Sequence, residues 1–447
     1  MDLFDQMNAV PRASKFDRDR TVSAGIPGNR RFQAIGLASL ICLFIVVCCL
    51  TFALGSRDYG GAYIFYDPAR LAYAIAAIAA FSVVASIFVF TEFSFGYFVG
   101  FYCYTMILGY LWLNCFSPFN YDHRLAGISA ATSAVAFLLP ALLITSPVRP
   151  VYRLSEKAMR RLLALILLFA AAIVVIGSSY NFRLINVTEI YTYREQLQFP
   201  TLINYATAAT MTVLLPYAFA CYVARKSTWG SGAALLLSVA FYPVTLTKVA
   251  LFMPAWLVML AILGRIFETR IATILSLLLP VMAGVIFFIV AHDEAYRFFN
   301  VVNMRMIITP SSAMDFYNEY FARHSLTYFC QMWILKPFVP CALEVPLSVE
   351  MANNYVQGNM NASLFATEGI ASVGLWFAPL SAFFCGLVIA IGNRVSAGLP
   401  KHLVFVSSGI LAQVIMNVPL TVTLVTHGMA LLFVLWYVTP RTLSGEQ

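Results

Sequence analysis

Long apolar runs separated by short polar stretches are the dominant pattern along this chain. Runs of about 20 apolar residues cross a bilayer as helices, because a helix satisfies its own backbone hydrogen bonds in lipid. The pattern predicts an all-α integral membrane protein with about twelve transmembrane helices. The predicted spans are 32–54, 71–91, 94–113, 125–145, 162–179, 201–224, 231–246, 249–264, 271–291, 370–393, 402–418 and 420–440.

The spacing of these runs also predicts how the chain is organised. A polar tail (1–31) precedes nine spans with short loops (32–291), a long loop (292–369), three further spans (370–441) and a short tail (442–447). The long loop is rich in Phe, Tyr, Trp and Met, a composition unlike that of disordered segments, so it is expected to be ordered. The seventh and eighth spans are short and interrupted by Pro243 and Pro254, so a pair of half-buried segments is an alternative there.

Composition supports the membrane interpretation. The 447 residues are 61% hydrophobic and 11% charged, with a mean hydropathy of +0.81, which nearly excludes the soluble enzyme classes. The first apolar run begins near Phe32 and is long enough to stay in the membrane as a signal anchor rather than to be cleaved.

The net charge of +8 is explained by topology rather than by nucleic-acid binding. Basic residues concentrate in the N-terminal tail and in 149-RPVYRLSEKAMRR-161. The positive-inside rule then places both termini in the cytoplasm and the long loop on the outer face. Some attraction to anionic membrane lipid is also expected.

The polar stretch 305-RMIITPSSAMDFYNEYFARH-324 stands out in the long loop. Pro310 is predicted to end one element, and Ser312 to begin a helix that carries an acid in its first turn. Asp315, Glu319 and Arg323 then share one face, which predicts an amphipathic helix lying along the outer membrane surface. This helix is either an interfacial element with a solvated acidic stripe or a platform for sugars. Its aromatic flank comprises Phe316, Tyr317, Tyr320, Phe321, His324 and Tyr328.

Arg305 lies just before that helix in the apolar setting NVVNMRMIITP. A buried guanidinium requires a carboxylate or a phosphate, and its planar fork suits bidentate contact with either. Arg305 is therefore expected to be a diphosphate clamp or to form an ion pair with Glu319 or Glu368.

Three further groups of residues are candidates for substrate binding, and each also has a purely structural explanation. In 191-YTYREQLQF-199, a charge pair flanked by tyrosines suits sugars or is an unimportant surface pair. Lys248, between two apolar runs, is either functional or a lysine that snorkels at a helix end. Amides before the tenth span hydrogen-bond either sugar hydroxyls or loop backbone. The residues concerned are Tyr191, Tyr193, Arg194, Glu195, Lys248, Asn354, Asn359 and Asn361.

The sequence carries no nucleotide-binding loop and no metal-binding histidine pattern, so neither a cofactor nor a metal is expected. Cys330 and Cys341 in the long loop could form a disulfide, with Cys115 as a competing partner. The remaining cysteines lie in apolar runs, where they are expected to act as small buried hydrophobes.

The chain resembles the Wzy-type polymerases of O-antigen and oligosaccharide repeat units in bacterial inner membranes. The resemblance covers roughly residues 180–395. It is carried by YTYREQLQF, TKVALFMP, MRMIITPSSAMDFYNEYF and PLSVEMANNYVQGNMNASLFATEGIASVG. Arg194 and Arg305 match the arginines of the two main outer loops of the family, and Lys248 matches a basic residue at that junction. Glu368 departs from the common form, which leaves its role in doubt.

The resemblance implies a glycosyltransferase with an all-helical fold related to the GT-C class. Such an enzyme transfers a glycan from undecaprenyl diphosphate to a repeat unit on a second carrier, at the periplasmic surface. A chain-length regulator protein is a further candidate partner. Arginines would stabilise the leaving diphosphate, Arg305 first and Arg194 second. The candidates for a general base are Glu195, Glu319, His324 and Glu368.

Two other functions remain open at the sequence level. An O-antigen ligase, or another lipid-linked glycan transferase, would use the same donor with a different acceptor, and His324 is compatible with it. A polysaccharide flippase would place its charges inside the bundle. Only Glu92 and Lys248 are expected at membrane depth, which disfavours the flippase.

Overall fold

The computed structural model describes residues 27–58, 64–185, 193, 199–291, 297–332, 334–355 and 366–441. These residues form helices and connecting loops, and no strand occurs among them. Within the same residues, nine helical segments are long and apolar enough to cross a membrane, which confirms the all-α membrane class. They are Arg31–Ser56, Pro68–Phe90, Phe95–Phe116, His123–Leu143, Glu156–Tyr180, Thr201–Ala224, Lys248–Ile266, Thr269–Val290 and Ala366–Ser396.

Three of the predicted spans are divided into shorter helices. The span 231–246 is divided just before Pro243 and ends at the left-handed Leu246 (φ 48°). The span 402–418 is divided at Ser408, and the span 420–440 is divided at Gly428 (φ 77°). The total number of crossings therefore stays a prediction. The short helices are α11 (Thr228–Ala240), α12 (Tyr242–Thr245), α19 (Lys401–Ser407), α20 (Gly409–Ile415), α21 (Leu420–Val425) and α22 (Met429–Val438).

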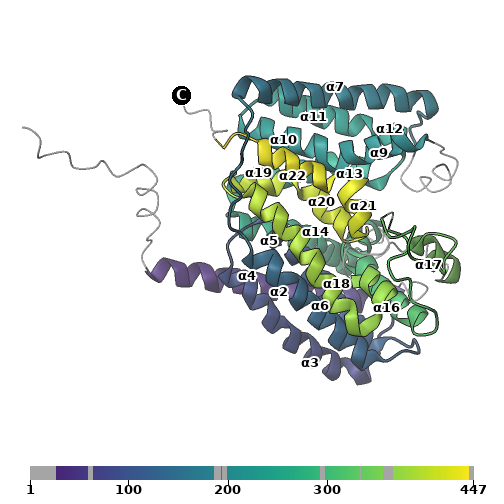
Figure 1. Ribbon diagram of the computed structural model, residues 1–447. Coiled ribbons are helices and arrows are strands. Elements are labelled where there is room, and N and C mark those ends of the chain that lie inside the picture. Colours follow the sequence, from purple (N-terminus) through teal and green to yellow (C-terminus); the bar gives the residue numbers. More distant parts are fainter. Residues whose placement is uncertain are drawn as a thin grey trace, which may run out of the picture.

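The long helices lie side by side in one bundle (Figure 1). Helix α5 (Phe95–Phe116) is its core, since every residue of α5 except Asn114 is buried. Helices α2 (Pro27–Asp58), α3 (Leu71–Ser82) and α6 (His123–Leu143) lie on one side of it, and α7 (Glu156–Tyr180) lies on the far side beyond α10 (Leu215–Ala224) and α11.

One end of the bundle carries α16 (Thr309–Phe321) and α17 (Leu347–Tyr355), drawn in green at the right of Figure 1. We call it the α16 end. At the other end lie the start of α7 and the last turns of α10 and α18 (Ala366–Ser396) (Figure 1). We call it the basic end, because contacts there bring together the cations of 149–161, Arg225, Arg270, Arg394 and Lys401.

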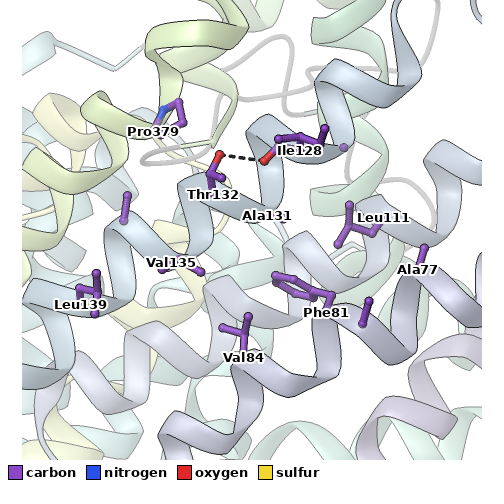
Figure 2. A pocket seen from close by; sticks show the side chains of 13 residues that line it. Ala77, Phe81, Val84, Leu111, Ile128, Ala131, Thr132, Val135, Leu139 and Pro379 are labelled. Atoms are coloured by element: carbon purple, nitrogen blue, oxygen red, sulfur yellow. Dashed lines mark hydrogen bonds between the residues drawn. The ribbon is translucent and has the colours of Figure 1, made fainter.

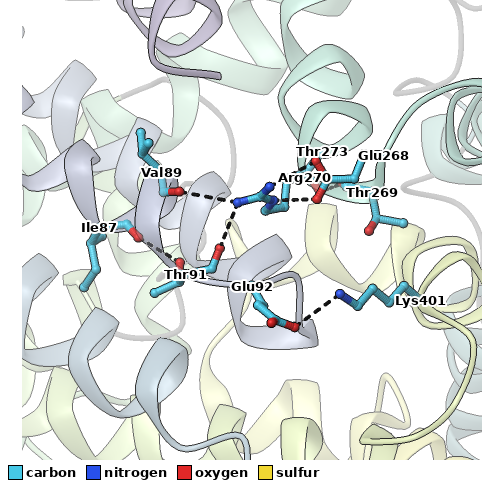
Figure 3. A network of polar contacts seen from close by, with 9 residues as sticks. All are labelled: Ile87, Val89, Thr91, Glu92, Glu268, Thr269, Arg270, Thr273 and Lys401. Carbon is cyan, nitrogen blue, oxygen red and sulfur yellow. Dashed lines mark hydrogen bonds and ion pairs between the residues drawn. The ribbon is translucent and has the colours of Figure 1, made fainter. Parts of the chain in front are cut away.

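Connections at the basic end are tied to one another. The Arg270 side chain pairs with Glu268 (2.5 Å) and donates to the carbonyl oxygens of Val89 and Thr91, both at 3.4 Å (Figure 3). Lys401 and Glu92 form a second, exposed pair at 3.3 Å. Glu92 therefore lies in a connection at this end, not at membrane depth as expected. The exposed pair is worth at most about 1 kcal/mol, so it contributes little to stability.

Helix α16 does not lie on a surface. It continues without a break from the π-helical segment Asn300–Ile308, so Pro310 ends no element and Ser312 caps none. The hydroxyl of Ser311 donates to the carbonyl oxygen of Met106 (3.0 Å), about 15 Å below the end of α5. All residues from Pro310 to Asn318 are buried. The predicted surface helix is thus wrong: small and aromatic side chains seat α16 inside the bundle end.

Helix α18 (Ala366–Ser396) is broken at Gly374, whose φ of 74° and ψ of 175° suit glycine alone. The break releases the carbonyl oxygens of Ala371 and Ser372. They accept backbone N–H groups from Thr327 (2.9 Å) and Tyr328 (3.0 Å), so the break attaches the α16–α17 connection to the bundle.

A disulfide joins Cys330 to Cys341 within that connection. Cys115, the alternative partner, is a free buried thiol in α5. The sequence-based pairing is confirmed, and it closes a small loop in the segment between α16 and α17.

Candidate functional site

A buried polar network holds α16 against the connection between α5 and α6. Asp315 is 3% exposed and accepts a hydrogen bond from the hydroxyl of Tyr121. That hydroxyl also lies 3.0 Å from Oδ1 of Asn114 and 3.3 Å from the hydroxyl of Tyr110, which accepts from Nδ2 of Asn318 at 2.8 Å. Every residue of this network makes at least one hydrogen bond, although Oδ1 of Asn318 is buried and accepts none from the described residues. The network therefore positions α16 rather than exposing a reactive atom.

Burial raises the pKa of Asp315 to about 6, against the lowering effect of hydrogen bonds from Tyr121 and Ser117. Asp315, which was expected to lie on a solvated acidic face of the helix, is therefore buried. With a pKa of about 6, the Asp315 carboxyl changes from mostly protonated to mostly ionised as the pH rises through 6.

One turn further along α16, Glu319 is the centre of a second cluster. It forms an ion pair with Arg323 at 2.7 Å and accepts a hydrogen bond from the hydroxyl of Tyr355 on α17. The ring of Tyr355 also packs on Phe316 with centroids 4.7 Å apart. The Glu319 side chain is 12% exposed, whereas Arg323 is 56% exposed and faces outward.

His324 lies beside that pair, at the end of α16. Its ring stacks on Tyr320 with centroids 3.9 Å apart and an interplanar angle of 9°. Nδ1 lies 2.8 Å from the Tyr320 carbonyl oxygen, which can only accept, so Nδ1 carries the proton. Nε2 is then the acceptor in the neutral ring, and it makes no hydrogen bond with any residue that the structure describes.

The stacked pair is supported by α17. The hydroxyl of Tyr320 donates to Oε1 of Glu350 (2.8 Å), and Nδ2 of Asn354 donates to the same oxygen (3.1 Å). Burial, and then the hydrogen bond to Glu350, raise the pKa of Tyr320 to about 12, so the phenol stays protonated. Five residues predicted from the sequence are thus brought together: Glu319, Tyr320, Arg323, His324 and Asn354.

Glu368 and Tyr317 lie deeper. Glu368, in the first turn of α18, is 8% exposed and accepts the backbone N–H of Leu420 at 3.3 Å. Tyr317 is fully buried. Both side chains are buried, so neither is exposed beside His324 and Arg323.

Arg305 is separate from this cluster. It is exposed, which makes the expectation of a buried guanidinium wrong. It precedes Glu319 on the same continuous helix by about 20 Å. Its neighbour Asn303 anchors this part of the helix by donating to the carbonyl oxygen of Val281 (2.9 Å) and to Oγ1 of Thr51 (3.2 Å).

The remaining candidates lie elsewhere or cannot be placed. Lys248 is the first residue of α13 (Lys248–Ile266), behind the capping hydroxyl of Thr247, so its predicted position at a span end is confirmed. The ring of Tyr193 lies under the Arg183 guanidinium, 5.2 Å from its centroid. Tyr191, Arg194, Glu195, Asn359 and Asn361 fall outside the described residues.

Sequence reasoning missed the partners of Asp315. They lie at the end of α5 and in the connection that follows it, 114-NCFSPFNYDH-123. A cluster of amide, phenol and imidazole groups so close to a span end was the available signal. Among the described residues, no group of three metal-ligating side chains occurs.

Together, the fold and this cluster define the chain as a multi-pass helical membrane protein. Ion-paired and hydrogen-bonded side chains form a polar site at one end of its helix bundle. No family model, curated protein or solved structure matches it.

Proposed function

We propose that this protein is a polysaccharide polymerase, a glycosyltransferase that joins oligosaccharide repeat units carried on undecaprenyl diphosphate. Two lines support the proposal. The first is the resemblance of residues 180–395 to the Wzy-type polymerases. The second, which carries the most weight, is the position of His324 and Arg323, an exposed base and an exposed cation side by side at one end of a membrane bundle.

We also propose that the α16 end faces the periplasm of a bacterial inner membrane. The Cys330–Cys341 disulfide lies at this end, and disulfides persist in oxidising compartments. The cations concentrate at the opposite end, as the positive-inside rule requires of a cytoplasmic face.

The chemistry follows from the cluster. Nε2 of His324 would accept the proton of the acceptor hydroxyl as its oxygen bonds to the anomeric carbon of the donor. The bond from that carbon to the diphosphate oxygen breaks at the same time, and undecaprenyl diphosphate leaves. Arg323 is placed to stabilise the charge that develops on the leaving group. Glu319 would orient Arg323 through their ion pair.

Arg305 then has a different task from the one expected. Since about 20 Å separates it from Glu319, it would hold the diphosphate of the acceptor carrier rather than that of the donor. In a polymerase the reacting sugar of the acceptor lies at the far end of a repeat unit from its own diphosphate. A separation of this size suits an oligosaccharide of a few sugars.

The test is deletion of the gene followed by gel analysis of the surface glycan. The expected result is single capped repeats in place of a ladder, restored by the wild-type gene. Loss of all attached glycan would contradict a polymerase and indicate a ligase, and accumulation of cytoplasm-facing lipid-linked repeats would indicate a flippase.

An O-antigen ligase is the second candidate, favoured by one observation. A histidine with an open acceptor nitrogen beside an arginine is the combination expected of ligases as well. Complementing the deletion with His324→Gln separates protein loss from loss of chemistry. We expect the rate of glycan transfer to fall about 100-fold or more with normal membrane levels, because a glutamine side chain cannot take up the proton.

A further inference from the structure

An apolar groove lies on the surface of the bundle. It encloses about 630 Å³ between α3, α5, α6 and α18 (Figure 2). Along α6 it extends from Gly127 to Leu139, a distance of about 18 Å. This length is close to the depth of one leaflet, half of a hydrocarbon core that is about 30 Å thick.

The lining carries no free polar group to repel a hydrocarbon chain. Small residues, among them Ala77, Ala80 and Ala131, line it together with Phe81 and Pro379. Thr132 is the one lining residue with a polar side chain. Its hydroxyl lies 2.7 Å from the carbonyl oxygen of Ile128 and 3.0 Å from that of Ser129, so it is satisfied within its own helix.

Cations lie where the groove approaches the α16 end. Arg124 lies one turn before Gly127 and Ile128 on the same face of α6, and it is exposed. It makes no hydrogen bond or ion pair with any residue in the described part of the chain. Arg70 precedes α3 and reaches the carbonyl oxygen of Cys115 (3.5 Å), one turn beyond the lining residue Leu111.

The acids nearby are already engaged. Asp67 pairs with Arg70 at 3.7 Å and accepts the backbone N–H of Ala69, while Asp122 accepts the backbone N–H of Leu125 to cap α6. Arg124 is therefore the cation left to meet an anion at the membrane surface. Each basic residue near an anionic headgroup strengthens binding by about fivefold.

From this combination we propose that the groove binds one acyl chain of an anionic phospholipid from the leaflet at the α16 end, with its phosphate beside Arg124. The length of the groove matches an acyl chain within one leaflet, whereas a polyprenyl carrier of the proposed substrate is far longer. The proposal is independent of the glycosyltransferase function.

The test uses the full-length protein in vesicles of phosphatidylcholine that contain phosphatidylglycerol with a photoactivatable acyl chain. Crosslinks are expected on peptides that carry Ala80, Ile128 and Val135. Replacing the probe with photoactivatable phosphatidylcholine should lower the labelling about fivefold, as should Arg124→Ala in the presence of the anionic probe. Arg160→Ala, an exposed arginine at the basic end, is the matched control and should change nothing.

A second pair of variants tests the groove itself. Ala80→Trp fills it and should abolish the labelling, whereas Ala79→Trp places the same ring on an exposed position of α3 that faces away from the groove. Equal labelling of these two variants would overturn the proposal, and so would equal labelling by the two headgroups. Stronger labelling by a photoactivatable polyprenyl phosphate would also overturn it, in favour of the substrate carrier.

Discussion

At the scale of single residues, Arg305 was expected to be buried but is exposed. Its exposure means that the side chain can be removed with little effect on the fold, since exposed substitutions usually change stability by less than about 0.5 kcal/mol. A functional effect at this position would therefore be separable from a folding effect.

We predict that Arg305→Ala lowers polymerisation about 100-fold or more while the protein stays inserted at normal levels, because a diphosphate contact is lost. Arg305→Lys should rescue poorly, since an ammonium group lacks the bidentate fork. Glycan ladders and membrane immunoblots measure the two effects. A near-normal ladder in Arg305→Ala would show that the residue holds no diphosphate.

Asp315 provides a prediction about pH. Its pKa is raised by burial from 3.8 to about 6, so the folded state holds a proton in a range where the unfolded state does not. Stability must then fall as pH rises from about 4 to about 6, by up to about 3 kcal/mol.

Asp315→Asn should remove this fall, because the amide oxygen still accepts from Tyr121 but does not ionise. Measured in detergent between pH 4 and pH 7, the Tm of the wild type should decline more steeply than that of the variant. Parallel profiles would show that another group dominates the pH dependence.

At the scale of elements, the break in α18 has a measurable role. It attaches the α16–α17 connection to the bundle through two backbone hydrogen bonds. At the break, Gly374 adopts a backbone conformation in which any residue other than glycine is strained.

We predict that Gly374→Ala lowers stability by about 1–3 kcal/mol, because alanine is strained at this φ and ψ. Gly232→Ala is the matched control. A Cβ there meets nothing within 4 Å, and in the middle of α11 the same substitution should stabilise the protein by about 0.5–1 kcal/mol. Thermal unfolding in detergent measures both, and equal shifts would mean that the break tolerates other residues.

Apolar run length predicted the long helices well, because crossing a membrane requires a stretch of hydrophobic residues that sequence reports directly. It did not predict that the runs over α11, α12 and α19 to α22 are divided into short helices, and whether these runs cross the membrane stays a prediction. It failed also for α16. Helical periodicity shows that a face is polar, but it cannot distinguish a face that meets water from one that meets Tyr121 and Ser117.

At the scale of the whole molecule, the α16 end carries the disulfide and the opposite end carries most of the cations. This difference predicts how the protein is oriented in the membrane. We expect a membrane-impermeant thiol reagent to label Ser325→Cys in intact spheroplasts. Ser146→Cys, exposed at the basic end, should be labelled only after permeabilisation. Wild-type protein, with its free cysteines mostly buried, gives the background. The reverse labelling pattern would contradict the proposed periplasmic location of the site.

The candidate site was partly predictable because α16 is one local segment. Glu319, Tyr320, Arg323 and His324 lie within it, so their proximity follows from helical spacing. The support from Glu350 and Tyr355 on α17, and from Tyr121 far earlier in the chain, depends on tertiary packing that local pattern does not encode.

The seating of α16 inside the bundle has a consequence for biosynthesis. With the α16 end at the periplasm, as proposed, the segment from Asn300 to Phe321 would cross the membrane with the following loop and then fold back, because it is too polar to be inserted by the translocon as a span. The carbonyl oxygens of Met106 and Val281 keep their own helical hydrogen bonds without it and gain a second one from Ser311 and Asn303 when it arrives. Because the segment Asn300–Ile308 packs against α2, α5 and α14 (Thr269–Val290), we expect these three helices to pack fully only after it is in place.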